Sequence, residues 1–366
     1  MTDLIIENVS KAYGKTLVLH GVTIDVAAGE TVVVCGPSGG GKTVLLRLVS
    51  GVVEPDAGDI RIAGRSVVGL GPERRDVGMA FQNFALYPHL TAFENIASPL
   101  RARGLAAAAV NRGVQEIAQL LRIDHVLKHM PRELSNGQKQ RTSLARSLVR
   151  GPGVLLLDDP LRNVDAKLRY EMRLELPRLL RNFGSAVLYV TQDYKEAMAL
   201  GNRIAVLRGG RIEQLAPPSS IYGEPESVEV ARLFGDPTIN LYPARPRRGA
   251  GGPTVELFGR AWRLPQACEA ALERDCLLGL RPEDVRIENE PERDAVAFEL
   301  DAVTPLNVRG VLYLRGPQGE ELLATVPERD IARFGRGHRR VFVDLPAERL
   351  HLFDRQSGQR LAGAPT

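Results

Sequence analysis

The feature that most constrains this chain is a glycine-rich stretch that directly follows a short apolar run. A G-x-x-x-x-G-K-[ST] pattern occupies Gly36–Thr43 (GPSGGGKT), and the apolar run Thr31–Cys35 before it predicts a buried strand. Such a loop between a strand and a helix turns backbone N–H groups inward, where they bind phosphate oxygens. Lys42 would neutralise phosphate charge and the Thr43 hydroxyl would hold Mg²⁺. A glycine-rich turn without a ligand is the less favoured alternative.

Two further stretches belong with this loop, namely Leu134–Gln138 (LSNGQ) and Leu155–Asp159 (LLLDD). Asp158 ends the apolar run Val154–Leu157, so its carboxylate is expected at the carboxyl edge of a strand, where open α/β sheets bind ligands. Asp158 is therefore the expected Mg²⁺ partner of Thr43. The alternative is that Asp158 caps the next helix.

The order and spacing of these stretches resemble the ATP-binding subunit of an ABC transporter, from about Leu4 to Asn240. Within that family, Phe81–Leu90 (FQNFALYPHL) and Gly279–Val285 (GLRPEDV) resemble the ATPases of sugar and polyol importers. Arg173–Leu179 and Leu233–Asn240 resemble the paired ATPases of glycerol-type importers. The resemblance implies an ATPase that uses ATP and Mg²⁺.

Composition bounds the fold and the partners. A chain of 366 residues predicts two or three domains, and an apolar content of 44% supplies their cores. No apolar run approaches the roughly 20 residues that span a bilayer, and no basic leader precedes an apolar run, so we expect a soluble cytosolic protein unless a partner holds it at a membrane. The three cysteines have no metal-ligand spacing. The basic residues are dispersed among nearly as many acids, so we expect no nucleic acid partner.

The pattern along the first two thirds predicts an α/β fold. Leu4–Val9 and Val22–Val26 alternate apolar and polar residues, as half-buried antiparallel strands do. Short continuous apolar runs separated by helical patterns predict a mostly parallel sheet that is covered on both faces. These runs are Thr31–Cys35, Val77–Phe81, Val154–Leu157, Ala186–Thr191 and Arg203–Leu207.

Two boundaries follow from composition. Helix formers between about residues 88 and 150 predict a helical subdomain inside an ABC ATPase domain of residues 1–240. After Asn240 the chain becomes rich in Gly, Pro and Arg, so a second domain of residues 241–366 is expected. Its short strand-like segments predict a small all-β barrel, similar to the OB-like regulatory domain of sugar-importer ATPases. These segments are Thr254–Phe258, Val285–Ile287, Val311–Leu314 and Arg340–Asp344.

Three positions around the expected nucleotide depart from the family. Asp159 stands where the family has a glutamate that activates water, and the missing methylene withdraws the carboxylate by about 1.5 Å. The alternative is that Asp159 only caps a turn before Pro160. Gln192 replaces a histidine that contacts the γ-phosphate, and it carries no charge near neutral pH. Val44 replaces a hydroxyl residue. The resemblance therefore implies a weakened catalytic site at Asp159 and Gln192.

The resemblance also assigns the remaining contacts. Ser135 and Gly137 would meet the γ-phosphate bound by an opposite subunit, although Ser135 is also a plausible helix N-cap and Asn136 replaces the usual glycine. Tyr13 would present its ring to adenine, and Gln82 would sense Mg²⁺. The nucleotide-binding residues predicted in this way are Tyr13, Gly36, Ser38, Gly39, Gly40, Gly41, Lys42, Thr43, Val44, Gln82, Ser135, Asn136, Gly137 and Gln138. The predicted metal ligands are Thr43, Gln82 and Asp158.

Two interfaces are implied as well. The apolar residues Phe84, Leu86, Tyr87 and Pro88 predict a groove for a membrane partner's helix. Asn163 and Asp165 match the segment that contacts a second ATPase subunit, where Arg162 replaces a small residue.

We interpret the chain as the ATP-binding subunit of an ABC importer for a sugar, polyol or glycerol-type solute, peripheral on the cytoplasmic side of the cell (inner) membrane. It would form the weaker half of a heterodimer with a second ABC ATPase subunit. It would also work with two transmembrane permease subunits and indirectly with a substrate-binding protein. The alternatives are a soluble regulatory ABC ATPase without membrane partner and a nucleotide-binding scaffold without hydrolysis.

Overall fold

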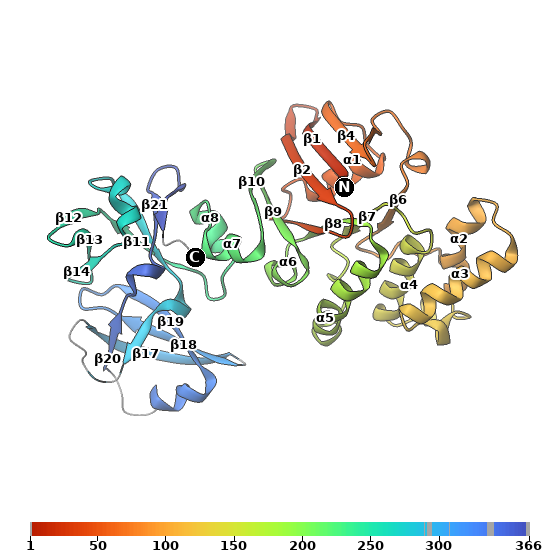
Figure 1. The fold of residues 1–366 in the computed structure, drawn as a ribbon. Helices are drawn as coiled ribbons and strands as arrows, with labels where there is room; N and C mark the ends of the chain where they lie inside the picture. The colour runs from red at the N-terminus through yellow and green to blue at the C-terminus, as the bar shows by residue number, and fades with distance from the viewer. Residues whose placement is uncertain (1, 289, 291–294, 307, 335–339, 364–366) are drawn as a thin grey trace. The chain divides into compact units, whose positions relative to one another are not determined.

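The structure is a computed structural model that describes residues 2–288, 290, 295–306, 308–334 and 340–363 (Figure 1). The chain divides into two compact units, Met1–Pro218 and Ser219–Thr366. Each unit has a hydrophobic core of its own. Among the described residues, no helix is long and apolar enough to cross a membrane.

A six-stranded sheet forms the centre of the first unit, in the order β10-β9-β3-β8-β7-β6. Its strands are β3 (Thr31–Cys35), β6 (Val77–Ala80), β7 (Val154–Asp158), β8 (Ala186–Thr191), β9 (Arg203–Arg208) and β10 (Arg211–Ala216). All pairs are parallel except β9 with β10. Every residue of β3, β7 and β8 is buried, which explains their continuous apolar sequences. The predicted parallel sheet is confirmed, with β10 added as an antiparallel edge.

An antiparallel sheet packs on the same core, in the order β2-β1-β4-β5. Its strands are β1 (Thr2–Tyr13), β2 (Thr16–Ala27), β4 (Ala57–Ile62) and β5 (Arg65–Ser66). Alternate residues of β2 are buried, so the alternation in the sequence marks its core face. Helix α1 (Lys42–Ser50) contributes Leu45 and Leu46 to the core shared by the two sheets.

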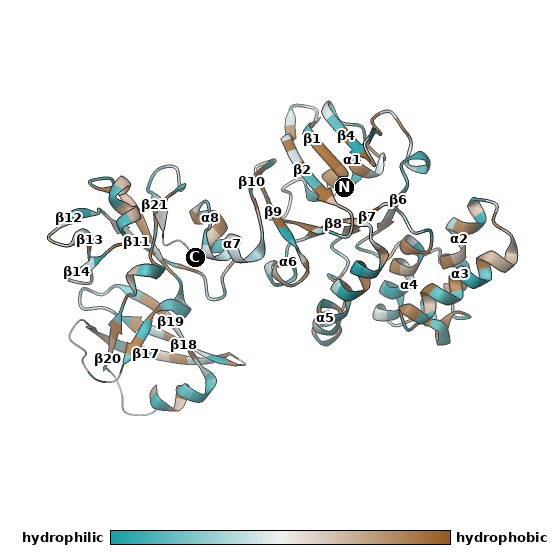
Figure 2. Ribbon diagram, in the orientation of Figure 1, coloured by the Kyte–Doolittle hydropathy of each residue, from teal (hydrophilic) through white to brown (hydrophobic). Residues whose placement is uncertain are grey.

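Three helices between β6 and β7 form the expected helical part: α2 (Ala92–Ala102), α3 (Ala107–Leu120) and α4 (Asn136–Leu148). Thr91 begins α2 with a capping box, in which its hydroxyl accepts from the Glu94 amide and the Glu94 carboxylate accepts from the Thr91 amide. All three carry hydrophobic and hydrophilic stretches (Figure 2), as helices buried on one face do. Helices α5 (Ala166–Phe183) and α6 (Tyr194–Leu200) follow β7 and β8.

The second unit is mainly β structure. Three antiparallel sheets have the orders β11-β15-β21-β22, β12-β13-β14 and β16-β20-β17-β18-β19. Their strands are β11 (Asn240–Ala244), β12 (Arg247–Gly249), β13 (Gly252–Leu257), β14 (Arg260–Arg263), β15 (Cys276–Leu280), β16 (Arg286–Glu288), β17 (Val296–Leu306), β18 (Arg309–Arg315), β19 (Glu321–Pro327), β20 (Arg340–Asp344), β21 (His351–Asp354) and β22 (Arg360–Gly363). One cluster of buried residues joins the sheets, including Phe258, Phe298 and Trp262. This agrees with the expected all-β domain.

The division between the units falls about twenty residues before the expected boundary at Asn240. Helices α7 (Pro218–Gly223) and α8 (Val228–Leu233) lie between the division in the structure and the expected boundary. Val228 and Ala231 of α8 pack on Phe353, and the buried Arg281 donates to the carbonyls of Tyr222 and Phe234. The segment rich in Gly, Pro and Arg instead contains β11 and β12. The change in composition therefore marks the ends of strands. It does not show that α8 belongs with the β structure, because the contacts of α8 involve residues distant in sequence.

Candidate functional site

The glycine-rich loop links β3 to α1, and two of its glycines leave no room for a side chain. A Cβ at Gly36 would lie 2.1 Å from the Leu207 backbone oxygen, and one at Gly41 would lie 2.7 Å from Leu19 Cδ2. Gly41 also has a left-handed φ of 94° and gives α1 no side-chain cap. The first N–H groups of α1 are therefore available to an anion.

Lys42 is buried at the first position of α1, where its ammonium donates to the carbonyls of Gly36 at 2.9 Å and Pro37 at 2.7 Å. Burial lowers its pKa, while Asp159 and Asp158 act in the opposite direction. The ammonium is thus held against the loop by backbone oxygens. A phosphate group is a stronger acceptor that can compete for the same donors.

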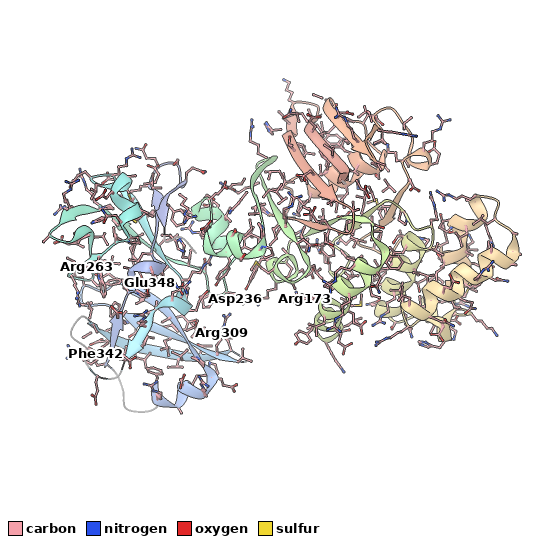
Figure 3. The ribbon with its side chains drawn as sticks, viewed as in Figure 1. Arg173, Asp236, Arg263, Arg309, Phe342 and Glu348 are labelled. Carbon is pink, nitrogen blue, oxygen red and sulfur yellow. The ribbon has the colours of Figure 1, made fainter. Side chains whose placement is uncertain are left out.

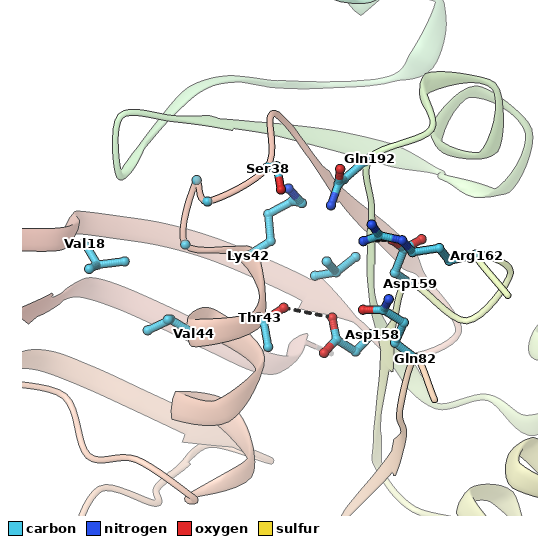
Figure 4. Close-up of a pocket in the computed structure, with 14 residues that line it drawn as sticks. Val18, Ser38, Lys42, Thr43, Val44, Gln82, Asp158, Asp159, Arg162 and Gln192 are labelled. Atoms are coloured by element: carbon cyan, nitrogen blue, oxygen red, sulfur yellow. Dashed lines mark hydrogen bonds and ion pairs between the residues drawn. The ribbon is translucent and has the colours of Figure 1, made fainter. Parts of the chain in front are cut away.

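A cavity of about 300 Å³ opens beside the loop (Figure 4). It gathers the glycine-rich loop and the end of the stretch Leu155–Asp159 with separate positions at Gln82 and Gln192. The predicted residues that line it are Ser38, Gly39, Gly40, Gly41, Lys42, Thr43, Val44, Gln82, Asp158, Asp159 and Gln192. Val18, Arg162 and Val190 also line it and were not among the predicted site residues. The motifs alone gave no signal for the two valines, since neither side chain carries a reactive group.

Oxygen donors converge at one end of this cavity. The Thr43 hydroxyl donates to Asp158 Oδ1 at 3.1 Å, the interaction drawn as a dashed line in Figure 4. Burial raises the pKa of Asp158, and the bond from Thr43 lowers it. The Gln82 side chain lines the same cavity, and its backbone carbonyl accepts from Asn163 Nδ2 at 2.9 Å. One hydroxyl, one carboxylate and one amide fit Mg²⁺, which prefers oxygen ligands and usually binds few protein groups beside substrate phosphates.

Asp159 and Gln192 line the same cavity. The Asp159 amide donates to the Val190 carbonyl at 2.8 Å, so β7 stays tied to β8 beyond the last strand residue. Asp159 has a left-handed φ of 44°, and its buried carboxylate lies 3.7 Å from Arg162 Nη1. Burial raises the pKa of Asp159, against the effect of Arg162. Asp159 also closes a turn, since its carbonyl accepts from the Arg162 amide at 3.2 Å. Asp159 therefore both closes a turn and lines the cavity.

A buried polar network anchors the segment around Gln192. Glu196 Oε2 accepts from Tyr189 Oη at 2.9 Å and lies 3.0 Å from Thr191 Oγ1. Burial raises the pKa of Glu196. Arg173 of α5 (Figure 3) forms an ion pair with Asp193 and approaches Glu196 Oε1 at 3.8 Å. The residues on either side of Gln192 are therefore fixed, although Gln192 itself faces the cavity.

The stretch Leu134–Gln138 lies outside this cavity. Ser135 is the N-cap of α4, where its hydroxyl accepts from the Gln138 amide at 3.3 Å and the Gln138 side chain accepts from the Ser135 amide at 2.9 Å. The N-cap alternative is confirmed, and α4 begins at Asn136. A Cβ at Gly137 would lie 2.4 Å from Leu168 Cδ2. Contact of Ser135, Asn136, Gly137 and Gln138 with nucleotide of another subunit stays a prediction.

Two other predicted residues do not line the cavity. Tyr13 lies at the end of β1 with 47% of its surface exposed, and the Lys11 ammonium lies 5.8 Å from its ring centre. Contact of Tyr13 with adenine stays a prediction. Gly36 acts through its carbonyl, which accepts from Lys42.

A second hollow of about 480 Å³ lies between β6, α2 and α4. Of the four apolar residues that predicted a groove, only Tyr87 lines it, together with Phe81. Phe84 and Leu86 are half-buried and Pro88 is exposed. The loop is held on α4, because Ser143 Oγ donates to the Phe84 carbonyl at 2.8 Å and Arg146 Nη1 donates to the Ala85 carbonyl at 2.8 Å.

Known proteins resemble this chain along its whole length. Residues 19–162 match the family described as ABC transporter, and residues 278–353 match the TOBE domain. The chain is 41% identical over 361 residues to the sn-glycerol-3-phosphate import ATP-binding protein UgpC of Cereibacter sphaeroides, with 99% of this chain and 100% of the relative covered. The protein of the same description from Escherichia coli O157:H7 is 39% identical over 364 residues, with 99% and 100% covered.

A solved structure supports the same assignment for the first unit. The ATP-binding cassette MJ0796, in a dimeric post-hydrolysis state bound to ADP and Pi, matches with a TM-score of 0.54 and 29% identity, covering 59% of this chain and 98% of the other. The glycine-rich loop, the carboxylates at the end of β7 and the whole-length similarity agree. The chain belongs to the family of ABC transporter ATP-binding proteins, and it is an ATPase with a C-terminal TOBE domain.

Proposed function

We propose that this chain is the ATP-binding subunit of an importer for sn-glycerol-3-phosphate or a closely related glycerol-type solute. The observation that carries the proposal is the whole-length similarity of about 40% to several proteins described as sn-glycerol-3-phosphate import ATP-binding proteins. The similarity spans both units, including the TOBE segment outside the nucleotide site. Its partners are two transmembrane permease subunits and, indirectly, a substrate-binding protein, so the chain works at the cytoplasmic face of the membrane.

The experiment is reconstitution of the complex in vesicles with its substrate-binding protein. We expect sn-glycerol-3-phosphate to stimulate ATP hydrolysis and to enter the vesicles, whereas glucose and free glycerol leave both rates unchanged. Stimulation by a different solute would change the substrate assignment and keep the importer. Purification of the chain without any membrane subunit would instead support a soluble regulatory ATPase.

The nucleotide site supports a division of roles. The loop N–H groups and Lys42 bind the phosphates, and Thr43, Asp158 and Gln82 hold Mg²⁺, which neutralises phosphate charge when it is bound. Asp159 orients the attacking water, and Gln192 hydrogen-bonds the terminal phosphate without adding charge. Because Asp159 is short and Gln192 is neutral, we assign the chain to the weaker half of a heterodimeric ATPase pair, with Ser135 and Gly137 serving the partner's ATP.

The hollow beside Tyr87 is the proposed docking site for a permease helix. Tyr87 is 47% exposed and Phe81 is 38% exposed, and Arg146 covers the Tyr87 ring at 5.4 Å from its centre. Two exposed aromatic rings that line one hollow can bury apolar surface against a helix.

We expect Tyr87→Glu to release the chain from membranes that contain the permeases. The change removes the ring and places a carboxylate where the partner helix packs, and burial of that charge opposes docking. Arg146 can pair with the new carboxylate in the free subunit, so the fold should persist. Membrane sedimentation measures the effect, and Tyr170→Glu is the matched control because Tyr170 is 64% exposed on α5. Equal recovery of both variants with the membranes would exclude this docking site.

A further inference from the structure

Arg162 is a cation in the nucleotide cavity that the described role of this site does not use. Its backbone is anchored in the turn after β7, where its amide donates to the Asp159 carbonyl at 3.2 Å and its carbonyl accepts from Arg169 Nη2 at 3.3 Å. Its side chain is half exposed, at 51%, and lines the same cavity as Lys42 and Gln192. Arg162 therefore reaches the cavity from a fixed backbone with a side chain that can still move.

The guanidinium is only loosely held. Within the part of the chain that the structure describes, its one ion pair is with Asp159, and the 3.7 Å separation exceeds hydrogen-bond distance. Arg75 of the same unit is firmly bound by comparison, to Glu54 at 2.7 Å and to the Leu70 carbonyl at 2.7 Å. Arg162 thus retains N–H donors for another acceptor, and the planar guanidinium suits phosphate oxygens.

The charges around the cavity favour an anion beside Arg162. The positive charge of Arg162 lowers the pKa of Lys42, in addition to the larger effect of burial. The two cations therefore repel each other across the cavity that both line. Figure 4 shows the Arg162 and Gln192 side chains on the side of the cavity away from Val44 and Val18. Gln192 brings no charge to that side. A phosphate placed between the loop and Asp159 would lie next to Arg162 and relieve the repulsion between the two cations.

We propose that Arg162 binds the terminal phosphate of ATP in this chain's own site, moving from its loose ion pair with Asp159 and supplying the positive charge that Gln192 lacks. This inference rests on the proposed nucleotide site, and it assigns to Arg162 the discrimination of ATP from ADP. A chain with a weak catalytic carboxylate then still holds ATP firmly. Hydrogen bonds to charged groups predict a loss of about 10- to 100-fold in affinity when such a contact is removed.

The test is calorimetric titration of the full-length chain with ATP and with ADP, in the absence of divalent metal so that no ATP is hydrolysed. We expect Arg162→Ser to weaken ATP binding about 10-fold or more and to leave ADP binding within twofold of the parent. Arg162→Lys should recover part of the loss, because lysine keeps the charge without the planar donors. The exposed Arg178→Ser on α5 removes the same charge elsewhere and should change neither affinity.

Lys42→Ala separates failure of this inference from failure of the nucleotide site. If Lys42→Ala weakens binding of both nucleotides while Arg162→Ser changes neither, or changes both equally, Arg162 does not bind the terminal phosphate and the site stands. If Arg162→Ser leaves both affinities unchanged but alters the rate in a separate hydrolysis assay with Mg²⁺, Arg162 acts through Asp159 and the inference is again overturned. If Lys42→Ala changes neither affinity, the nucleotide site itself is wrong.

Discussion

Lys42→Ala is expected to weaken ATP binding about 100-fold. The ammonium is buried at the start of α1 and already donates to two loop carbonyls, so it is fixed where phosphate oxygens would bind. A hydrogen bond between charged groups stabilises a complex by up to about 3 kcal/mol, which corresponds to about that factor. Titration with ATP and with ADP measures the effect, and ADP binding should also weaken, since Lys42 lies within the loop.

The control for this prediction is Lys128→Ala, which removes the same group from an exposed position outside the cavity. The Lys128→Ala variant should bind ATP and ADP with the affinities of the parent. Circular dichroism and the melting temperature show whether the Lys42 variant keeps its fold. Unchanged affinity in a folded Lys42→Ala protein would mean that the glycine-rich loop does not bind phosphate.

The double change Asp159→Glu with Gln192→His should raise turnover at this chain's own site by about 10- to 100-fold. Glutamate extends the carboxylate by about 1.5 Å, and histidine adds a group that can carry a proton near neutral pH. A catalytic group misplaced by about 1 Å can cost about 100-fold in rate. Single-turnover hydrolysis in the assembled complex measures this site, with the partner's catalytic carboxylate disabled.

Asp159→Asn is the matched control, because it keeps the side-chain length and removes the charge. It should abolish the remaining hydrolysis if Asp159 orients the attacking water. A complex that contains two copies of this chain alone and hydrolyses ATP at ordinary importer rates would disprove the heterodimer, and it would make Asp159 an adequate base.

The sequence predicted the parts of the fold that depend on local pattern. Apolar runs such as Thr31–Cys35 indicated the strands correctly, because strands buried on both faces need no polar residues. The motifs also predicted that Thr43 and Asp158 lie close together, because the carboxyl ends of parallel strands meet at one sheet edge.

The remaining features depend on contacts between distant residues. No local pattern shows that α8 packs on Phe353, so the division after Pro218 does not follow from the sequence that predicted a boundary at Asn240. The place of Arg162 beside the cavity depends on the turn after β7, in which the Arg162 amide donates to the Asp159 carbonyl. That turn follows β7, and the pairing of β7 with β8 joins residues that are distant in sequence.

The same pairing has a consequence for how such a chain can evolve. Asp158 is in register with Val190, and the next amide is also bonded to that residue, so the backbone distance between positions 159 and 192 is set by the sheet. Sliding of one strand past the other cannot compensate for a shorter side chain there. With the roles that we propose for Asp159 and Gln192, the hydrolysis rate can therefore change through single side-chain changes at these two positions while the fold persists. Duplicated genes that begin as equal partners could diverge in this way into a fast and a slow subunit without losing their ability to assemble.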